Sequence, residues 1–253
     1  MNIKITKKQY QYLTEAMDLD FSFAELDSLP VDEKESYCRK HLGNSFSNGS
    51  ARKCYMLDDS KILKLAYNER GYAQNKVEVD MIKKANSFLL PKIYEYASDG
   101  SYIVMEHVLP CTYEDFEKVL GIPFKNKWRQ NSEKQQIMFK KGDTTVGYNK
   151  YFDGSKEPNE DFNGKSVLDI IWYIGDIYVY GDVENYSPMD SIEFEKIISD
   201  NPWFGELKRL SRQYGLTDLE QMENYGLTKR NGKMCIVLLD CGLDYETFQE
   251  FYA

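Results

Sequence analysis

Residues 218–242, DLEQMENYGLTKRNGKMCIVLLDCG, combine a polar loop, a turn and an apolar strand. Met234–Leu239 is a continuous apolar run, which is typical of a buried β-strand. Asp240 follows the run directly and precedes Cys-Gly, so its carboxylate is well placed to hold a cation at a cleft. Asn224 lies 16 residues upstream, the distance of a short hairpin that turns at Asn231-Gly232. A nucleotide site would need a second half, and the rest of the chain supplies candidates for it.

Length and composition are those of a soluble globular protein. The chain has 253 residues, 42% of them apolar and 29% charged, enough for one large domain or two lobes around a substantial core. The net charge of -9 argues against a general nucleic-acid-binding protein, which needs a basic surface. No run of 18 apolar residues is present, so we expect no membrane span.

Cysteine and histidine usage indicates a reduced chain in the cytoplasm. The five cysteines form no C-x-x-C pair, which argues against a disulfide framework or a zinc site. Two histidines are too few for a His-rich metal site. The first residues, MNIKITKKQYQY, lack the apolar segment of a signal peptide, so we expect no secretion.

Residues 1–41 are expected to form a helical extension that packs on the outside of the main domain. Residues 4–17 have apolar side chains near one helical face, and Val31–His41 predicts a second helix. Neither segment has a pattern that points to chemistry.

A β-hairpin with a small-residue loop before it is predicted for residues 42–68. The loop contains Gly43, Gly49 and Ser50, and small residues let backbone N–H groups approach phosphate oxygens. The glycine spacing does not match G-x-G-x-x-G, and a flexible hairpin loop without a ligand is the alternative.

A lysine and a glutamate follow on the next two elements. Lys64 lies on the predicted strand Lys61–Ala66, and strand alternation gives it apolar neighbours on its own face. Such a position suggests a partly buried cation with a partner, and an edge residue is the alternative. Residues 73–86 predict a helix, on which Glu78 could reach Lys64 if the helix packs on the sheet. Two more strands are expected in residues 92–108.

The order of these elements resembles that of the protein-kinase-like fold family, in particular the small kinase-like proteins encoded by bacteriophages. The resemblance covers residues 42–108 and about 200–245. It implies an α+β, bilobal fold with an antiparallel N-lobe sheet in 42–108. A reduced, mostly helical C-lobe would occupy 109–253 and contain an insertion at about 125–165.

The resemblance also implies ATP and Mg²⁺ as cofactors and a role for each matching residue. Lys64 would pair with the α- and β-phosphates, and Glu78 would orient it. The backbone of a hinge from Glu106 to Val108 would meet the adenine. The remaining pair, Asn224 and Asp240, would hold Mg²⁺, with Cys241 in place of the Phe of Asp-Phe-Gly.

The catalytic base is the part of the pattern that departs most from the family. Asp218 is the best candidate, but it precedes Asn224 by six residues where kinases have five. Leu216-Thr217 also stands where kinases have His-Arg. Glu220 is an alternative base and Glu223 a further one, and a solvated loop carboxylate is the alternative reading for each.

The middle of the chain predicts mainly helices. We expect them at residues 113–120, 166–175, 192–199 and 202–214, with an extended segment at 178–180 and short strands at 135–139 and 144–148. The helix 202–214 begins at a proline and ends at Gly215, so it leads the chain into the 218–224 loop.

Three functions are open at this point. The first is an ATP/Mg²⁺-dependent phosphotransferase whose acceptor is unknown. The second is a pseudokinase or scaffold that binds a phage or host protein without catalysis. It is favoured by the irregular base loop and by a sequence that ends 11 residues after Gly242, too soon for a peptide-substrate platform. The third is an unrelated α+β protein, in which Lys64 would lie far from Asp240. The oligomeric state is not indicated.

Overall fold

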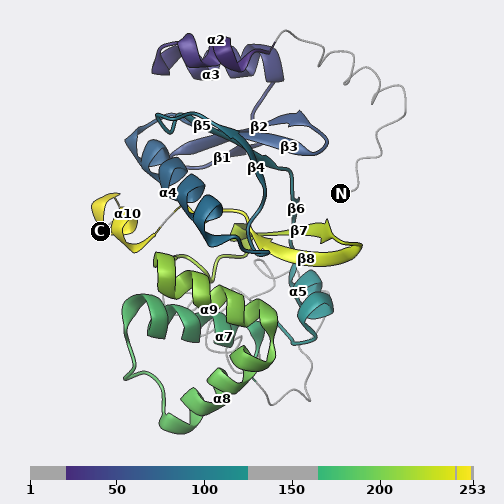
Figure 1. The fold of residues 1–253 in the computed structure, drawn as a ribbon, viewed down its shortest axis with the longest axis vertical. Coiled ribbons are helices and arrows are strands. Elements are labelled where there is room, and N and C mark those ends of the chain that lie inside the picture. Colours follow the sequence, from purple (N-terminus) through teal and green to yellow (C-terminus); the bar gives the residue numbers. More distant parts are fainter. Residues whose placement is uncertain (1–20, 125–164, 243, 252–253) are drawn as a thin grey trace, which may run out of the picture.

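The structure is a computed structural model and describes residues 21–124, 165–242 and 244–251. The helix expected at 4–17, the strands expected at 135–139 and 144–148, and nearly all of the expected insertion lie outside these residues. The fold is α+β. A five-stranded antiparallel sheet lies above a three-stranded sheet, and below both lie α5 (Tyr113–Leu120), α7 (Val167–Gly175), α8 (Pro188–Asp200) and α9 (Pro202–Tyr214) (Figure 1).

The five-stranded sheet, here called the upper sheet, has the order β1-β2-β3-β5-β4. Its strands are β1 (Ser47–Asn48), β2 (Arg52–Asp58), β3 (Lys61–Ala66), β4 (Ile93–Tyr96) and β5 (Tyr102–Glu106). The bounds of β3 are those predicted. Since side chains alternate along β3, Leu63 and Leu65 point to one face while Lys64 points to the other, as expected.

Two helices cover the outer face of the upper sheet. They are α2 (Phe23–Ser28) and α3 (Val31–Leu42), and they lie at the top of Figure 1. Leu26 and Tyr37 from these helices pack with Leu63 and Leu65 in one buried cluster. The predicted packing of this segment on the outside of the main domain is therefore confirmed for the described residues.

The inner face of the upper sheet receives α4 (Glu69–Ala85), which begins four residues before the predicted start at 73. Asn68 caps this helix because its side chain accepts a hydrogen bond from the Gly71 N–H at 3.0 Å. Gly71, expected in a loop, therefore lies in the first turn. A Cβ there would lie 2.3 Å from the Ala51 carbonyl oxygen, so only glycine allows this close approach of helix and strand.

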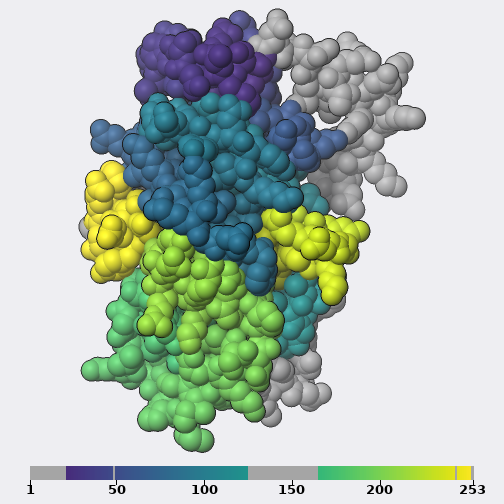
Figure 2. Space-filling model, viewed as in Figure 1, coloured from purple at the N-terminus to yellow at the C-terminus, as the bar shows by residue number. Residues whose placement is uncertain are grey.

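The three-stranded sheet, here called the lower sheet, consists of β6 (Leu109–Pro110), β7 (Tyr225–Arg230) and β8 (Lys233–Leu238). The β7–β8 turn is the predicted one. Asn231 and Gly232 have φ angles of 51° and 81°, as a tight two-residue hairpin requires. In the space-filling view this hairpin fills one side of the boundary between the upper and lower parts (Figure 2).

Helices form the remainder of the lower part. They are α5 (Tyr113–Leu120), α7 (Val167–Gly175), the π-helix η2 (Asp176–Tyr180), α8 (Pro188–Asp200), α9 (Pro202–Tyr214), the short 3₁₀ helix η3 (Met222–Asn224) and α10 (Tyr245–Phe251). The predicted α5 and α9 are confirmed. The extended segment expected at 178–180 is wrong, because the chain continues α7 as a π-helix. α8 begins at Pro188 with Ser187 as its cap, four residues before the predicted start.

Trp203 lies at the centre of the lower core. Its ring is 6% exposed and its Nε1–H donates to the Ile236 carbonyl oxygen at 3.1 Å, which ties α9 to β8. Phe116, Phe204 and Tyr225 surround the ring. This core is separate from the cluster under α2 and α3. None of the described helices is long and apolar enough to cross a membrane.

Candidate functional site

A cleft of about 770 Å³ lies between the upper and lower sheets. One end is apolar, with Ile62, Met105 and Val108 among its lining residues, and the other end contains Lys64 and Asp240. A smaller polar pocket of about 290 Å³ shares that charged end and extends toward α4. The two together form an elongated space that is apolar at one end and charged at the other.

The predicted lysine–glutamate pair is present at the charged end. The Lys64 Nζ lies 2.9 Å from Glu78 Oε1 and 3.1 Å from Oε2, and the glutamate is fully buried. Burial works to lower the pKa of Lys64, but the negative charges of Glu78 and Asp240 together outweigh it, so the pKa is raised. Lys64 is therefore a fixed cation.

Lys64 also connects the two sheets. Its Nζ donates to the Leu239 carbonyl oxygen at 2.5 Å, and Leu239 immediately precedes Asp240. The separation expected for an unrelated α+β protein, with Lys64 far from Asp240, is therefore not found.

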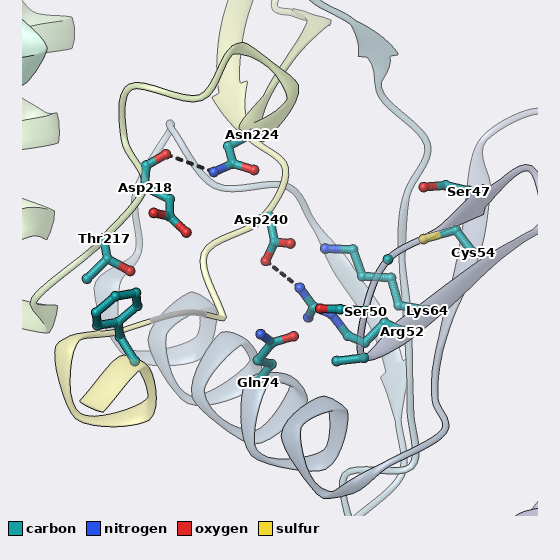
Figure 3. A pocket seen from close by; sticks show the side chains of 13 residues that line it. Ser47, Ser50, Arg52, Cys54, Lys64, Gln74, Thr217, Asp218, Asn224 and Asp240 are labelled. Atoms are coloured by element: carbon teal, nitrogen blue, oxygen red, sulfur yellow. Dashed lines mark hydrogen bonds and ion pairs between the residues drawn. The ribbon is translucent and has the colours of Figure 1, made fainter. Parts of the chain in front are cut away.

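Arg52 is the residue at this site that sequence reasoning missed. It is the first residue of β2, and its guanidinium Nη1 lies 2.6 Å from Glu78 Oε2 while Nη2 pairs with Asp240 Oδ1. Figure 3 shows the guanidinium beside Asp240, with Lys64 close by and Gln74 of α4 on the other side. Two cations and two carboxylates thus meet across the cleft.

Asp240 is held as a carboxylate by this arrangement. Burial works to raise its pKa, but the charges of Arg52 and Lys64 outweigh that effect and hold the pKa well below its usual range. The side chain of Asp240 is 44% exposed, and among the described residues its Oδ2 has no hydrogen-bond partner. That oxygen is available to a ligand in the cleft.

Asn224 and Asp218 are joined despite their unusual six-residue spacing. The Asn224 side-chain amide group donates to the Asp218 backbone oxygen at 2.8 Å. The side-chain oxygen Oδ1 of Asn224 therefore remains an acceptor on the cleft side (Figure 3). Asp218 has a positive φ of 55°, which aspartate tolerates better than most residues. Burial raises the pKa of Asp218, and the nearby charges of Glu220 and Asp240 raise it further.

The alternative bases lie elsewhere around the same loop. Glu220 does not line the cleft or the polar pocket; it lines a separate hollow of about 160 Å³ that also contains Asp218. Glu223 is exposed and lines the cleft itself. Asp218 is the one acid of the three that lines the polar pocket next to Asp240.

The small-residue loop reaches the site only in part. Gly49 and Ser50 line the polar pocket, where Gly49 N–H donates to the Arg52 carbonyl oxygen at 2.9 Å and so closes the turn before β2. Gly43 lies apart from them. It ends α3 with a φ of 81° and is not among the residues that line the cleft or the polar pocket.

The hinge expected at Glu106–Val108 lines the cleft and presents one available backbone donor. The Glu106 N–H donates to Lys92 and the His107 N–H to Ser60, at 2.8 and 2.7 Å. The Val108 N–H has no acceptor among the described residues.

The Glu106 side chain is engaged outside the cleft. Its carboxylate accepts hydrogen bonds from Thr228 at 2.9 Å and from Arg230 at 2.7 Å, which ties β5 to β7.

The oxygen atoms at the charged end fit a small divalent cation. Mg²⁺ prefers oxygen ligands and is commonly held by one or two protein groups together with substrate phosphates. Asp240 Oδ2 and the side-chain oxygen Oδ1 of Asn224 provide such a pair. The described residues contain no group of three or more His, Cys, Asp or Glu side chains suited to a metal.

No protein-family model, no curated protein and no solved structure gives a significant match to the chain. Inferences about function therefore depend on the geometry of the cleft.

Proposed function

We propose that this protein has a protein-kinase-like bilobal fold, binds ATP with Mg²⁺ in the cleft, and transfers a phosphoryl group to an acceptor that the sequence does not identify. One observation carries the proposal. Lys64, on the upper sheet, is held by the buried Glu78 and donates to the backbone next to Asp240, on the lower side of the same cleft. A fixed cation facing a carboxylate suits a polyphosphate with its metal.

The charged end would hold the phosphates. Lys64 donates to phosphate oxygens while Glu78 keeps its side chain in place, and Asp240 and Asn224 provide oxygen ligands for the cation. A cation held by Asp240 and Asn224 would supply neutralisation of the negative charge on the phosphates. Positioning and charge neutralisation would thus supply most of the catalysis.

The apolar end suits a purine base. Ile62, Met105 and Val108 offer apolar contact, and the Val108 N–H is a donor at the edge of the cleft. A planar heterocycle with one ring nitrogen facing that donor would satisfy it.

Asp218 is the base in this proposal. It lines the polar pocket beside Asp240, and its raised pKa brings its basicity closer to that needed to accept a proton from an acceptor hydroxyl. Asn224 fixes the backbone of Asp218 and so sets where the carboxylate stands.

A nucleotide-binding scaffold without catalysis is the second candidate, and one observation favours it. Arg52 already pairs with Asp240 Oδ1, so one of the two carboxylate oxygens is engaged. In this reading the cleft binds nucleotide without transferring a phosphoryl group, and a phage or host protein is bound elsewhere on the surface.

Thermal unfolding with and without nucleotide tests the proposal. Mg²⁺–ATP at a hundred times its dissociation constant stabilises the folded state by about 2.7 kcal/mol. For a chain of this size that raises Tm by roughly 5–10 °C. The shift should require Mg²⁺ and should be lost in Asp240→Asn but kept in the exposed control Asp80→Asn.

Phosphoryl transfer separates the two candidates. Label from γ-labelled ATP should reach an acceptor in a host lysate or the protein itself with the wild-type chain and not with Asp240→Asn. A nucleotide shift without any transfer would favour the scaffold. An unchanged Tm at saturating Mg²⁺–ATP would sink nucleotide binding altogether.

A further inference from the structure

Arg52 is a second cationic partner of Glu78, in addition to Lys64. Glu78 is fully buried and already pairs with Lys64 through both of its oxygens. One cation is sufficient to compensate one carboxylate. The guanidinium of Arg52 is a second cation on Glu78, and its other Nη reaches across the cleft to Asp240.

The position of Arg52 is fixed from several sides. Its side chain is 6% exposed, and Nη1 also lies 3.3 Å from Asn75 Oδ1 on α4. A Cβ at Gly242 would lie 3.1 Å from Nη1, so the guanidinium packs directly under the turn after Asp240. An arginine does not lose its proton in a protein, so the charge is permanent.

Arg52 and a metal ion would compete for the same oxygen. Kinase-type phosphoryl transfer commonly employs two Mg²⁺ ions, one of which the strand-end aspartate helps to hold. An aspartate at this position contacts both ions most readily when each of its two oxygens is open to one of them. Asp240 offers only Oδ2, because Oδ1 is taken by Arg52. Arg52 also lines the polar pocket, where it adds a positive charge of its own.

We propose that Arg52 takes the place of one metal ion, so that the cleft binds its nucleotide with a single divalent cation. This inference rests on the proposed nucleotide site. Asp240 Oδ2 and Asn224 hold the one cation, while Arg52 and Lys64 supply the charge that a second cation would otherwise bring. The protein would therefore keep its nucleotide at metal concentrations too low to fill a second site.

Counting bound Mn²⁺ tests the proposal. The full chain is saturated with a non-hydrolysable ATP analogue, Mn²⁺ is titrated in, and free Mn²⁺ is followed by electron paramagnetic resonance. The wild-type complex should bind one Mn²⁺. Arg52→Met removes the cation and should raise the number to two, while Arg52→Lys keeps a cation and should leave it at one. Arg212→Met, on the exposed surface of α9, is the matched control and should also give one.

The outcomes separate this inference from the function on which it rests. Two Mn²⁺ ions in the wild-type complex, or none, would overturn the inference while leaving nucleotide binding in place. One Mn²⁺ in both the wild type and a folded Arg52→Met would also overturn it. If Arg52→Met does not fold, the wild-type and Arg52→Lys counts still test whether the complex binds a single divalent cation. An analogue that does not bind at any Mn²⁺ concentration would remove the nucleotide site, and this inference with it.

Discussion

Glu78 is the residue on which most of the buried charge depends. It is fully buried on α4, and both Lys64 and Arg52 pair with it. Removing one partner of a buried ion pair is more costly than removing a surface pair, because it leaves an uncompensated charge in a poorly solvated place. Here a single substitution would leave Lys64 without a carboxylate partner, while Arg52 keeps its pair with Asp240.

Glu78→Gln keeps the side-chain size but removes the charge. We expect it to lower the free energy of unfolding by about 3–5 kcal/mol, measured by urea denaturation. Asp80→Asn on the same helix breaks an exposed pair with Lys84 and should change the stability little. Equal stability of the two variants would show that the buried pair contributes little.

Asp218 permits a test that separates catalysis from binding. Asp218→Asn tolerates the same positive φ of 55° but cannot accept a proton. We expect phosphoryl transfer to fall by about 10²–10⁴-fold, while the Mg²⁺–ATP shift in Tm is kept. Glu220→Gln is the comparison, since Glu220 lines a different hollow and should retain transfer. The reverse pattern would make Glu220 the base.

Local sequence is enough to predict Lys64 and Glu78 as a pair, but not Arg52. Strand alternation and helical periodicity fix the faces of Lys64 and Glu78, and both faces are confirmed. Arg52 stands in GSARKC, next to another basic residue and after a small-residue turn, which is typical of a solvated loop end. Its burial depends on the packing of β2 against both α4 and the turn after Asp240, and no local pattern encodes that contact.

At the scale of elements, the contact between α8 and α9 depends on a carboxylate. Glu195 of α8 accepts hydrogen bonds from Lys208 of α9 at 2.5 Å and from Tyr178 of η2. Burial works to raise the pKa of Glu195, but these donors outweigh it and lower that pKa below 4.5. The three elements are thus joined by a charge that low pH removes.

Stability should therefore depend on pH through Glu195. Its folded-state pKa is depressed, so its contribution is present above pH 4.5 and is lost as the pH falls through the folded-state value. We expect Glu195→Gln to be less stable than wild type by about 1 kcal/mol at pH 7, with the difference vanishing in acid. Urea denaturation across this pH range measures it. A difference that does not change with pH would mean that packing, not charge, matters here.

Element boundaries are predictable where a residue marks them on the helix itself. Pro202 and Gly215 define α9 as expected. α4 begins early because Asn68 is the cap and Gly71, which suggests a loop, serves a close contact with Ala51. The π-helix η2 was not predictable from its aromatic run, which favours an extended chain. Its conformation depends on contacts with α8 and α9.

At the scale of the whole molecule, side chains on three strands of the upper sheet make polar contacts with the lower part. Arg52 and Lys64 make two of them at the cleft, and Glu106 makes the third through Arg230 and Thr228. The third contact, made by Glu106, lies at the hinge between the two sheets and away from the phosphate end of the cleft.

A double-mutant cycle measures how strongly this third contact couples the two parts. Glu106→Gln and Arg230→Met should each lower the free energy of unfolding, with a coupling energy of about 0.5–3 kcal/mol. Lys229→Met, one residue away on the same strand and exposed, should change little. Additive effects of the first two variants would mean that the Glu106–Arg230 pair contributes no coupling between the two sheets.

The place of Trp203 has a consequence for spectroscopy. The chain has three tryptophans, of which Trp128 lies outside the described residues and Trp172 is 39% exposed on α7. Residues 21–124, which include the whole upper sheet, contain no tryptophan. With Trp128 and Trp172 replaced by phenylalanine, tryptophan emission would come from Trp203 and report the lower core, whereas far-ultraviolet ellipticity records the upper and lower parts together. Following one chain with both signals resolves the order in which its two cores melt.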